Sequence, residues 1–249
     1  MKKQELAKNI MHYRFDPRPE REWDTSAVVI LDGSKAILID TGYESQIPLL
    51  LDDLASNNIE VEAVIISHFH DDHMEGLKLL PGVPVYGSNR FQDALDKWIP
   101  EESHKYFNPA ILIDALKIIK FGEHTITLIP SPGHSECTVL VKINDQFLHV
   151  ADEIIFSADG RLSLPAVDCK SDMPRQIKSF EALKDYSGFT IIPAHGPAFC
   201  GDRLENVIQN LSRYMNAVLE SDGEITYEDA TKDCDCDFAN KNWHEGNCE

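Results

Sequence analysis

The stretch Ser67-His68-Phe69-His70-Asp71-Asp72-His73 directly follows a run of Val and Ile at residues 61–66, which predicts a buried strand. Alternate residues of an extended segment point the same way, so His68 and His70 can converge on one point. The turn after the strand then brings Asp72 and His73 close by. Imidazole and carboxylate groups are typical ligands of transition metals. Three of the ten histidines fall within these seven residues, and this density predicts a metal site at a strand end.

Three further polar residues each follow directly on a predicted strand, as the histidine cluster does. These are His134 after residues 125–129, Asp152 after residues 146–150 and His195 after residues 189–193. Any one of them alone would be an ordinary turn residue or a structural histidine. Strand ends are where ligands bind in α/β folds, so the three together predict one site shared with the cluster.

The series His68-x-His70-x-Asp72-His73, His134, Asp152 and His195 resembles the metal-binding signature of the metallo-β-lactamase superfamily. Asp40, within Leu38-Ile39-Asp40-Thr41-Gly42, matches the first motif of that family. The resemblance extends from about residue 25 to about residue 200. It implies an α/β fold with four layers, an αββα sandwich with the site at one edge of its two sheets.

The resemblance also implies a role for each ligand. One metal ion would be bound by His68, His70 and His134, a second by Asp72, His73 and His195, with Asp152 bridging the two. Asp40 would orient a ligand histidine from behind. The implied cofactors are two divalent transition metal ions, zinc in the first place, with iron or manganese as alternatives. A hydroxide between them would attack the substrate, and the catalytic residue Asp72 would pass a proton to the leaving group.

The residue at position 152 indicates which branch of the family this chain resembles. β-Lactamases of this fold commonly have Cys where this chain has Asp152, or lack a ligand there. The carboxylate resembles the glyoxalase II and lactonase branch, which implies hydrolysis of a small ester, thioester or lactone. The alternatives are a phosphodiesterase, a mononuclear iron persulfide dioxygenase and a metal-binding module without catalysis. The dioxygenase resembles this chain in His68 and His134, but its Arg-Thr-Asp-Phe type of segment is absent after Asp152.

The remainder of the chain mixes hairpins with strand–helix–strand units, an α/β order. Predicted strands lie at 27–31, 36–39, 61–66, 83–86, 125–129, 138–143, 146–150 and 189–193. Predicted helices lie at about 46–57, from 74 onward, at 173–185 and at 203–220. The stretch 89–120 is long and rich in aromatic residues, and the stretch 155–172 shows no clear period. Both are typical of pocket walls, and the alternative is a surface helix with ordinary connections.

The 249 residues carry a net charge of −19. Nucleic acid and anionic membranes are poor partners for such a surface, because phosphate binding needs clustered Lys and Arg. The charged start Met1-Lys2-Lys3 is not followed by an apolar core, so we expect no signal peptide and a cytoplasmic protein acting on a small molecule. The oligomeric state stays open. Six cysteines are expected as free thiols, namely Cys137, Cys169, Cys200, Cys234, Cys236 and Cys248.

The C-terminal residues differ in composition from the rest, so we expect a catalytic domain at 1–220 and an acidic tail at 221–249. Residues 220–249 hold ten acidic residues against two lysines, which favours a disordered or loosely docked extension. Alternatively, Cys234, Cys236 and Cys248 form a small zinc site with His244. Four further histidines are expected as surface or core residues without a ligand role, namely His12, His104, His124 and His149.

Overall fold

The central strands are uninterrupted apolar runs because both of their faces are covered. In β3 (Thr25–Asp32), Val28 and Ile30 belong to a core between two sheets, whereas Ala27 and Val29 pack on the opposite side. All four side chains are completely buried. A strand enclosed on both faces needs no alternation of polar residues, which explains why a short continuous run predicts it.

Two sheets lie face to face in the computed structural model, which describes residues 1–164 and 172–240. The first sheet has seven strands in sequential order: β1 (Lys2–Ala7), β2 (Ile10–Phe15), β3, β4 (Lys35–Ile39), β5 (Glu60–Ile65), β6 (Val85–Ser88) and β7 (Ile111–Ile113). The second has six, in the order β13 (Phe199–Cys200), β12 (Thr190–Ile192), β11 (Phe147–His149), β10 (Val139–Ile143), β9 (His124–Pro130) and β8 (Lys117–Phe121). Strands β4 to β7 run parallel, as do β11 and β12, whereas the other neighbours are antiparallel.

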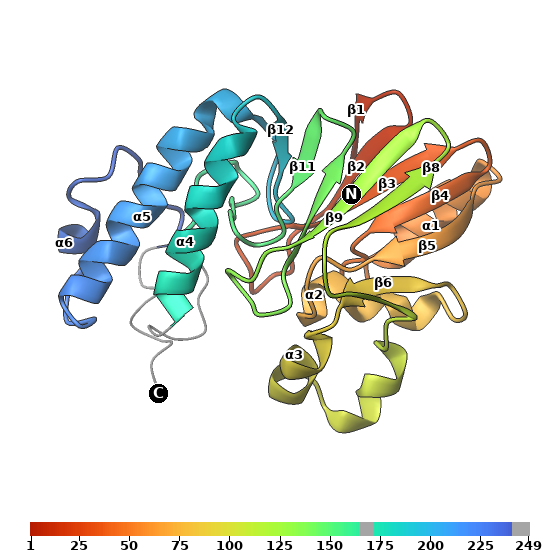
Figure 1. Ribbon diagram of the computed structural model, residues 1–249, viewed down its shortest axis with the longest axis horizontal. Coiled ribbons are helices and arrows are strands. Elements are labelled where there is room, and N and C mark those ends of the chain that lie inside the picture. Colours follow the sequence, from red (N-terminus) through yellow and green to blue (C-terminus); the bar gives the residue numbers. More distant parts are fainter. Residues whose placement is uncertain (165–171, 241–249) are drawn as a thin grey trace.

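Helices cover the outer face of each sheet, as Figure 1 shows. Helix α1 (Ile47–Ser56) packs on the first sheet through Ile47, Leu50 and Leu54. Helices α4 (Met173–Leu183) and α5 (Leu204–Glu220) pack on the second sheet. The order helix, sheet, sheet, helix confirms the predicted αββα sandwich.

The stretch 89–120, for which a surface helix was one of two interpretations, contains ordered secondary structure. Helix α3 (Phe91–Trp98) is followed by the short 3-10 helix η2 (Glu101–Tyr106) and by the edge strands β7 and β8. The N-terminal hairpin of β1 and β2 was also not predicted. Helix α2 (Asp71–Met74) begins inside the histidine cluster rather than at Met74, so the cluster itself makes the turn from strand to helix.

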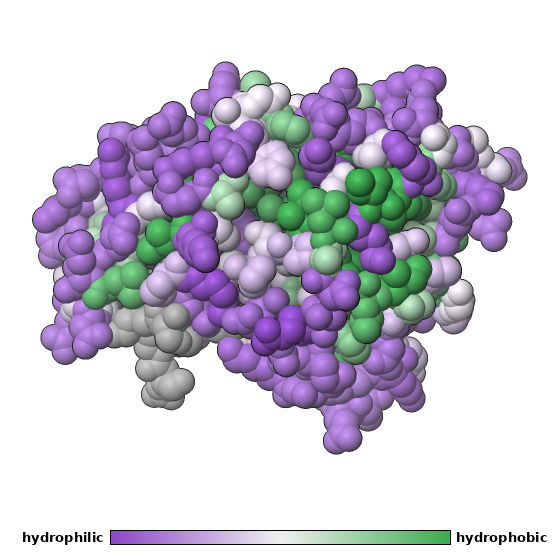
Figure 2. Space-filling view, viewed as in Figure 1, coloured by the Kyte–Doolittle hydropathy of each residue, from purple (hydrophilic) through white to green (hydrophobic). Residues whose placement is uncertain are grey.

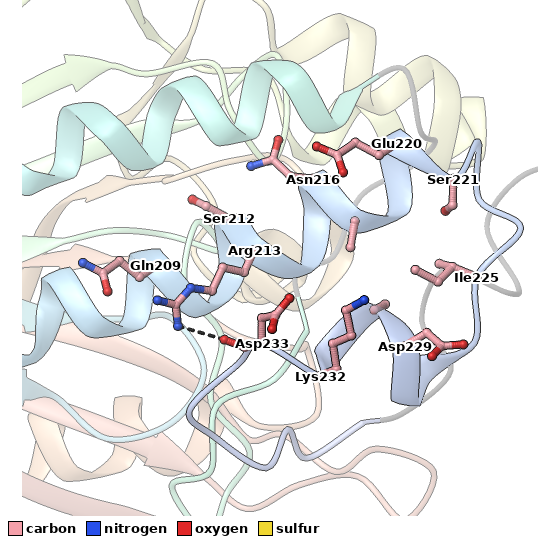
Figure 3. A pocket seen from close by; sticks show the side chains of 12 residues that line it. Gln209, Ser212, Arg213, Asn216, Glu220, Ser221, Ile225, Asp229, Lys232 and Asp233 are labelled. Carbon is pink, nitrogen blue, oxygen red and sulfur yellow. Dashed lines mark hydrogen bonds between the residues drawn. The ribbon is translucent and has the colours of Figure 1, made fainter.

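Residues 221–240 pack against the rest of the chain, so the expectation of a disordered or loosely docked tail is wrong for them. Helix α6 (Tyr227–Thr231) lies beside α5, and Phe238 is completely buried in the same core as Tyr214 of α5. Figure 3 shows the polar side of this junction, a hollow of about 610 Å³ where Arg213 donates to the carbonyl oxygen of Asp233 at 2.9 Å.

The proposed tail zinc site receives no support from the part of the tail that can be described. No group with metal-ligand geometry within residues 1–164 and 172–240 includes Cys234 or Cys236, and both are free thiols. The remaining members of that hypothesis, Cys248 and His244, lie outside the described residues, as does Cys169.

The visible face in Figure 2 is mainly hydrophilic, and hydrophobic surface gathers around β8 and β9. Ile118 of β8 contributes to the exposed apolar surface of the molecule. In residues 1–164 and 172–240, no helix combines the length and the apolar character that crossing a bilayer requires.

Candidate metal centre

All seven predicted ligands meet at one edge of the two sheets, because each follows the carboxyl end of a strand. The helix α2 that carries two of them lies at this edge in Figure 1. The first sheet contributes His68, His70, Asp72 and His73 after β5, and the second contributes His134 after β9, Asp152 after β11 and His195 after β12.

Three imidazoles converge at the first position. The Nδ1 atom of His70 lies 3.0 Å from Nε2 of His68 and 3.2 Å from Nε2 of His134. At these distances one proton can lie between two of the three nitrogen atoms. The third nitrogen atom then faces them with a lone pair. Such a cluster suits a bound cation.

A carboxylate joins two imidazoles at the second position. Nε2 of His73 lies 3.4 Å from Oδ1 of Asp72, and Nε2 of His195 lies 3.5 Å from its Oδ2. All three residues are at least largely buried, with the side chain of Asp72 13% exposed. A mixed His and Asp set of this kind is a usual hydrolytic metal site.

One carboxylate oxygen lies between the two positions. Oδ2 of Asp152 is 3.2 Å from Nε2 of His195 and 3.4 Å from Nε2 of His73. The same oxygen is 3.8 Å from Nε2 of His68 and 3.9 Å from Nε2 of His134. Asp152 therefore faces both groups at once, as a bridging ligand must.

Unsatisfied buried atoms indicate that the site is built for metal. Oδ1 of Asp152, Nε2 of His73 and Nε2 of His70 have no hydrogen-bond partner among residues 1–164 and 172–240. A buried polar atom without a partner costs about 1–3 kcal/mol, and for Asp152 and His73 coordination removes that cost. The donor set of imidazoles and carboxylates fits a transition metal.

Asp40 holds the cluster from behind, as predicted. Its Oδ2 accepts from Nδ1 of His73 at 2.9 Å and from Oγ of Ser67 at 2.7 Å, while its Oδ1 accepts from the Ser67 amide at 2.7 Å. Nδ1 of His68 lies 3.3 Å from the same Oγ and can donate to it. Both histidines thus turn Nε2 toward the site. Asp40 has a φ of 58°, a strained backbone of the kind that clusters at functional sites.

His195 is held by residues that the sequence did not reveal. Its Nδ1 donates to the backbone carbonyl of Asp24 at 2.5 Å, which leaves Nε2 free to face Asp152. The Asp24 carboxylate in turn accepts from the Gly196 amide at 2.7 Å and pairs with Arg14 at 2.6 Å. Asp24 and His195 are 171 residues apart, so no local pattern announces the contact.

Glu153 links the Asp152 loop to the His134 loop. It is buried, and its Oε1 accepts from the His134 amide at 2.8 Å while Oε2 accepts from Ser179 of α4. A Cβ on Gly133 would collide with the Glu153 carboxylate, so the glycine permits this close approach. The only feature of the sequence that could have indicated this role of Glu153 is its position directly after Asp152.

The charges differ between the two positions in the metal-free chain. Burial lowers the pKa of His68 well below its usual value and that of His70 to about 4. These rings are neutral at pH 7, with lone pairs available to a metal. Burial acts in the same direction on His195, but the carboxylates of Asp152 and Asp72 outweigh it and raise its pKa to about 9. A metal at the second position therefore has to displace protons.

Four other histidines have the structural roles that we expected, whereas the fifth, His244, lies outside the described residues. His12, His124 and His149 are buried. Nε2 of His104 lies 2.9 Å from the carbonyl oxygen of Ile99 and 3.2 Å from that of Leu95, so it caps the C-terminal end of α3. None of the four belongs to a metal-ligand group within the described part of the chain.

Comparison with known proteins agrees with the geometry. The chain is 25% identical over 220 residues to the Beta-lactamase-like protein 2 homolog of Caenorhabditis elegans, a match that covers 84% of this chain and 67% of the relative. It is 24% identical over 196 residues to the Hydroxyacylglutathione hydrolase of Pectobacterium carotovorum, covering 77% of this chain and 65% of the relative. A third relative, the Lactamase-like protein nscB of Neosartorya fischeri, is 26% identical over 78% of this chain and 56% of its own length. The chain thus spans about 56–67% of the length of these curated relatives.

Solved structures show the same fold. The metallo-beta-lactamase from Pontibacter korlensis superposes with a TM-score of 0.67 at 18% identity, over 84% of this chain and 99% of that chain. The DIM-1 metallo-beta-lactamase gives a TM-score of 0.65 at 17% identity, over 84% and 95%. The sequence signature of one protein family matches residues 21–195 of the chain, which end at the last predicted ligand, His195. On this match, the chain belongs to the Metallo-beta-lactamase superfamily.

Proposed function

We propose that this protein is a dinuclear metallohydrolase that cleaves an ester, a thioester or a lactone. The observation that carries the proposal is the position of Asp152 Oδ2, within 3.9 Å of four imidazole nitrogens that belong to two ligand groups. A carboxylate in that place would be able to bind two ions rather than one. We further propose zinc as the metal, since histidine and carboxylate ligands suit it.

Two such ions, held by the seven ligands, would supply a water molecule with its pKa lowered to about 7 and a positive charge that stabilises the oxyanion of the transition state. The chain supplies orientation. His68 and His73 are fixed through Asp40, and His195 is fixed through the carbonyl of Asp24. Fixed ligands keep the reacting groups in place without reorganisation during the reaction.

Asp72 is the proposed catalytic residue. Its two oxygen atoms face His73 and His195, and its side chain keeps some contact with solvent. From this place the carboxylate can accept a hydrogen bond from the attacking water and pass a proton to the departing oxygen or sulfur atom. The relative named as a hydroxyacylglutathione hydrolase supports a thioester among the candidate substrates.

Metal analysis tests the number of ions. We expect close to two zinc ions per chain after reloading, and Asp152→Ala should lose more metal than His70→Ala, because both ions lose a ligand. Tyr106→Ala serves as the control, since Tyr106 packs on Phe107 and contacts no ligand. A stoichiometry that stays near one in the reloaded protein would contradict the dinuclear proposal and favour a mononuclear iron enzyme.

A substrate panel tests the reaction class. The reloaded protein should hydrolyse members of a set of thioesters, lactones and nitrophenyl esters faster than it hydrolyses phosphodiesters or β-lactams. Preferential cleavage of phosphodiesters would overturn the assignment of an acyl substrate while leaving the metal site intact.

A further inference from the structure

Trp98 stands beside the first metal position without being covered by the protein. It is the last residue of α3, and its ring lies 5.9 Å from the ring of His70 at 84°. Phe91, Ala94 and Leu95 occupy the same face of the helix at helical spacing. Ala94 and Leu95 are buried, and Phe91 packs on Phe69.

That face should continue into the core, because residues three and four apart lie on one side of a helix. Trp98 nevertheless remains 48% exposed. A large apolar side chain that is aimed at a metal ligand and open to solvent leaves surface that a ligand can cover.

Two neighbouring groups contact the indole or the backbone that carries it. The ammonium group of Lys97 lies 4.7 Å from the centre of the Trp98 ring. The carbonyl oxygens of Leu95 and Ile99, which flank Trp98, are capped by His104. A tryptophan side chain has only two torsion angles to order, so it binds an apolar group with little loss of conformational entropy.

The direction of the substrate follows from the two ligand groups. Asp72, the proposed proton donor, faces His73 and His195, so the leaving group departs on that side. His70 belongs to the other group, with His68 and His134. The acyl group therefore extends toward His70 and Trp98, where α3 lies next to α2 in Figure 1.

We propose that Trp98 forms the wall of an acyl subsite, and that the substrate is an ester or thioester with an apolar acyl group of several carbons. This inference rests on the proposed function for its orientation. It assigns to Trp98 a role in substrate selection, in addition to any contact with His70.

The test compares wild type, Trp98→Ala and Trp98→Phe on p-nitrophenyl acetate, butyrate and hexanoate. Tyr106→Ala is the matched control, because Tyr106 is a similarly exposed aromatic residue of the neighbouring η2 that packs on Phe107 instead of a ligand. In wild type and in the control, kcat/KM should rise with chain length, by a factor of up to about four for each methylene that becomes buried.

Trp98→Ala should remove most of that rise, so that kcat/KM becomes similar for the three esters, while Trp98→Phe should keep part of it. An unchanged dependence on chain length in Trp98→Ala, or none in wild type, overturns the proposal. A loss of metal from both Trp98 variants also overturns it, because Trp98 would then act by supporting His70.

A binding measurement separates this inference from the proposed function. Acetate, butyrate and hexanoate are titrated into the zinc-loaded protein by calorimetry. If no ester is hydrolysed, an affinity that rises from acetate to hexanoate and becomes flat in Trp98→Ala still supports the subsite. An affinity of wild type that does not change from acetate to hexanoate refutes the acyl subsite.

Discussion

Replacing Phe238 by Ala should destabilise the protein strongly, although the residue belongs to a segment with a strongly acidic composition. Phe238 is completely buried, in a cluster with Tyr214, whose ring lies 6.1 Å away. The neighbouring backbone joins it to the loop beside the metal centre. The Ala239 amide donates to the Leu162 carbonyl at 2.9 Å, and Leu162 pairs with Phe156.

The expected magnitude follows from burial. Truncation of a fully buried Phe to Ala costs about 3–5 kcal/mol, because apolar contacts are lost and a cavity remains. In a chain of this size each kcal/mol lowers the melting temperature by about 2–4 °C. We therefore expect a fall of about 6–20 °C. A chain that ends at Ser221 should be less stable still, because it lacks both Phe238 and the buried Ala230.

Thermal unfolding followed by circular dichroism measures this change. Tyr106→Ala is the control for removal of an aromatic ring, since Tyr106 is 46% exposed and an exposed substitution usually changes stability by less than about 0.5 kcal/mol. If Phe238→Ala and Tyr106→Ala melt within a degree or two of wild type, residues 221–240 do not contribute to the core and the packing described above is wrong.

Three further predictions concern the site and the core. Glu153→Ala should lower metal content by freeing the His134 loop, whereas Glu153→Gln, which keeps an acceptor for the His134 amide, should retain most of the metal; equal losses would contradict this role. Burial holds the pKa of His12 at about 3 in the folded chain, so as the pH falls below about 6.5 only the unfolded chain gains a proton at this residue. The folded state of wild type therefore loses stability at low pH, and His12→Leu does not. Relative to wild type, His12→Leu should gain about 2 kcal/mol of unfolding free energy between pH 7.5 and pH 5, and a constant difference in chemical denaturation would refute it. Asp72→Asn should keep much of its metal but lose kcat by roughly 10²–10⁴-fold on an alkyl ester and less on a nitrophenyl ester, whereas equal losses on both would show that Asp72 is only a ligand.

The ligands were predictable because their signal is local. The alternation of His68 and His70 after a run of Val and Ile places both side chains on one side of a strand end. His134, Asp152 and His195 repeat the pattern of a polar residue after a strand. The structure brings all seven ligands together, and the family match extends over the same part of the chain.

What supports the ligands could not be predicted, because it depends on contacts that are distant in sequence. Asp24 holds His195 from a loop 171 residues away. Strand β1 was also missed, since its side chains are almost all exposed at a sheet edge and show no apolar alternation. The C-terminal segment was misjudged because composition averages over residues, whereas a single buried residue such as Phe238 is enough to anchor a short segment.

The support of the ligand histidines is uneven, and this unevenness orients the site. His73 and His68 are held by Asp40 and Ser67, and His195 is held by the carbonyl of Asp24. His70 is different, because its Nε2 atom has no hydrogen-bond partner within residues 1–164 and 172–240.

The ring of His70 instead meets the indole of Trp98, which is 48% exposed. A ligand that is fixed through polar groups of the core faces inward, whereas a ligand that is flanked by an exposed apolar surface marks the side from which substrate can approach. The hydrogen-bonded ligands therefore form the inner side of the centre, and in the function that we propose His70 and Trp98 lie on the side from which substrate approaches. Under the proposed function, this asymmetry would give one site both a fixed geometry for catalysis and an open surface for selecting the acyl group.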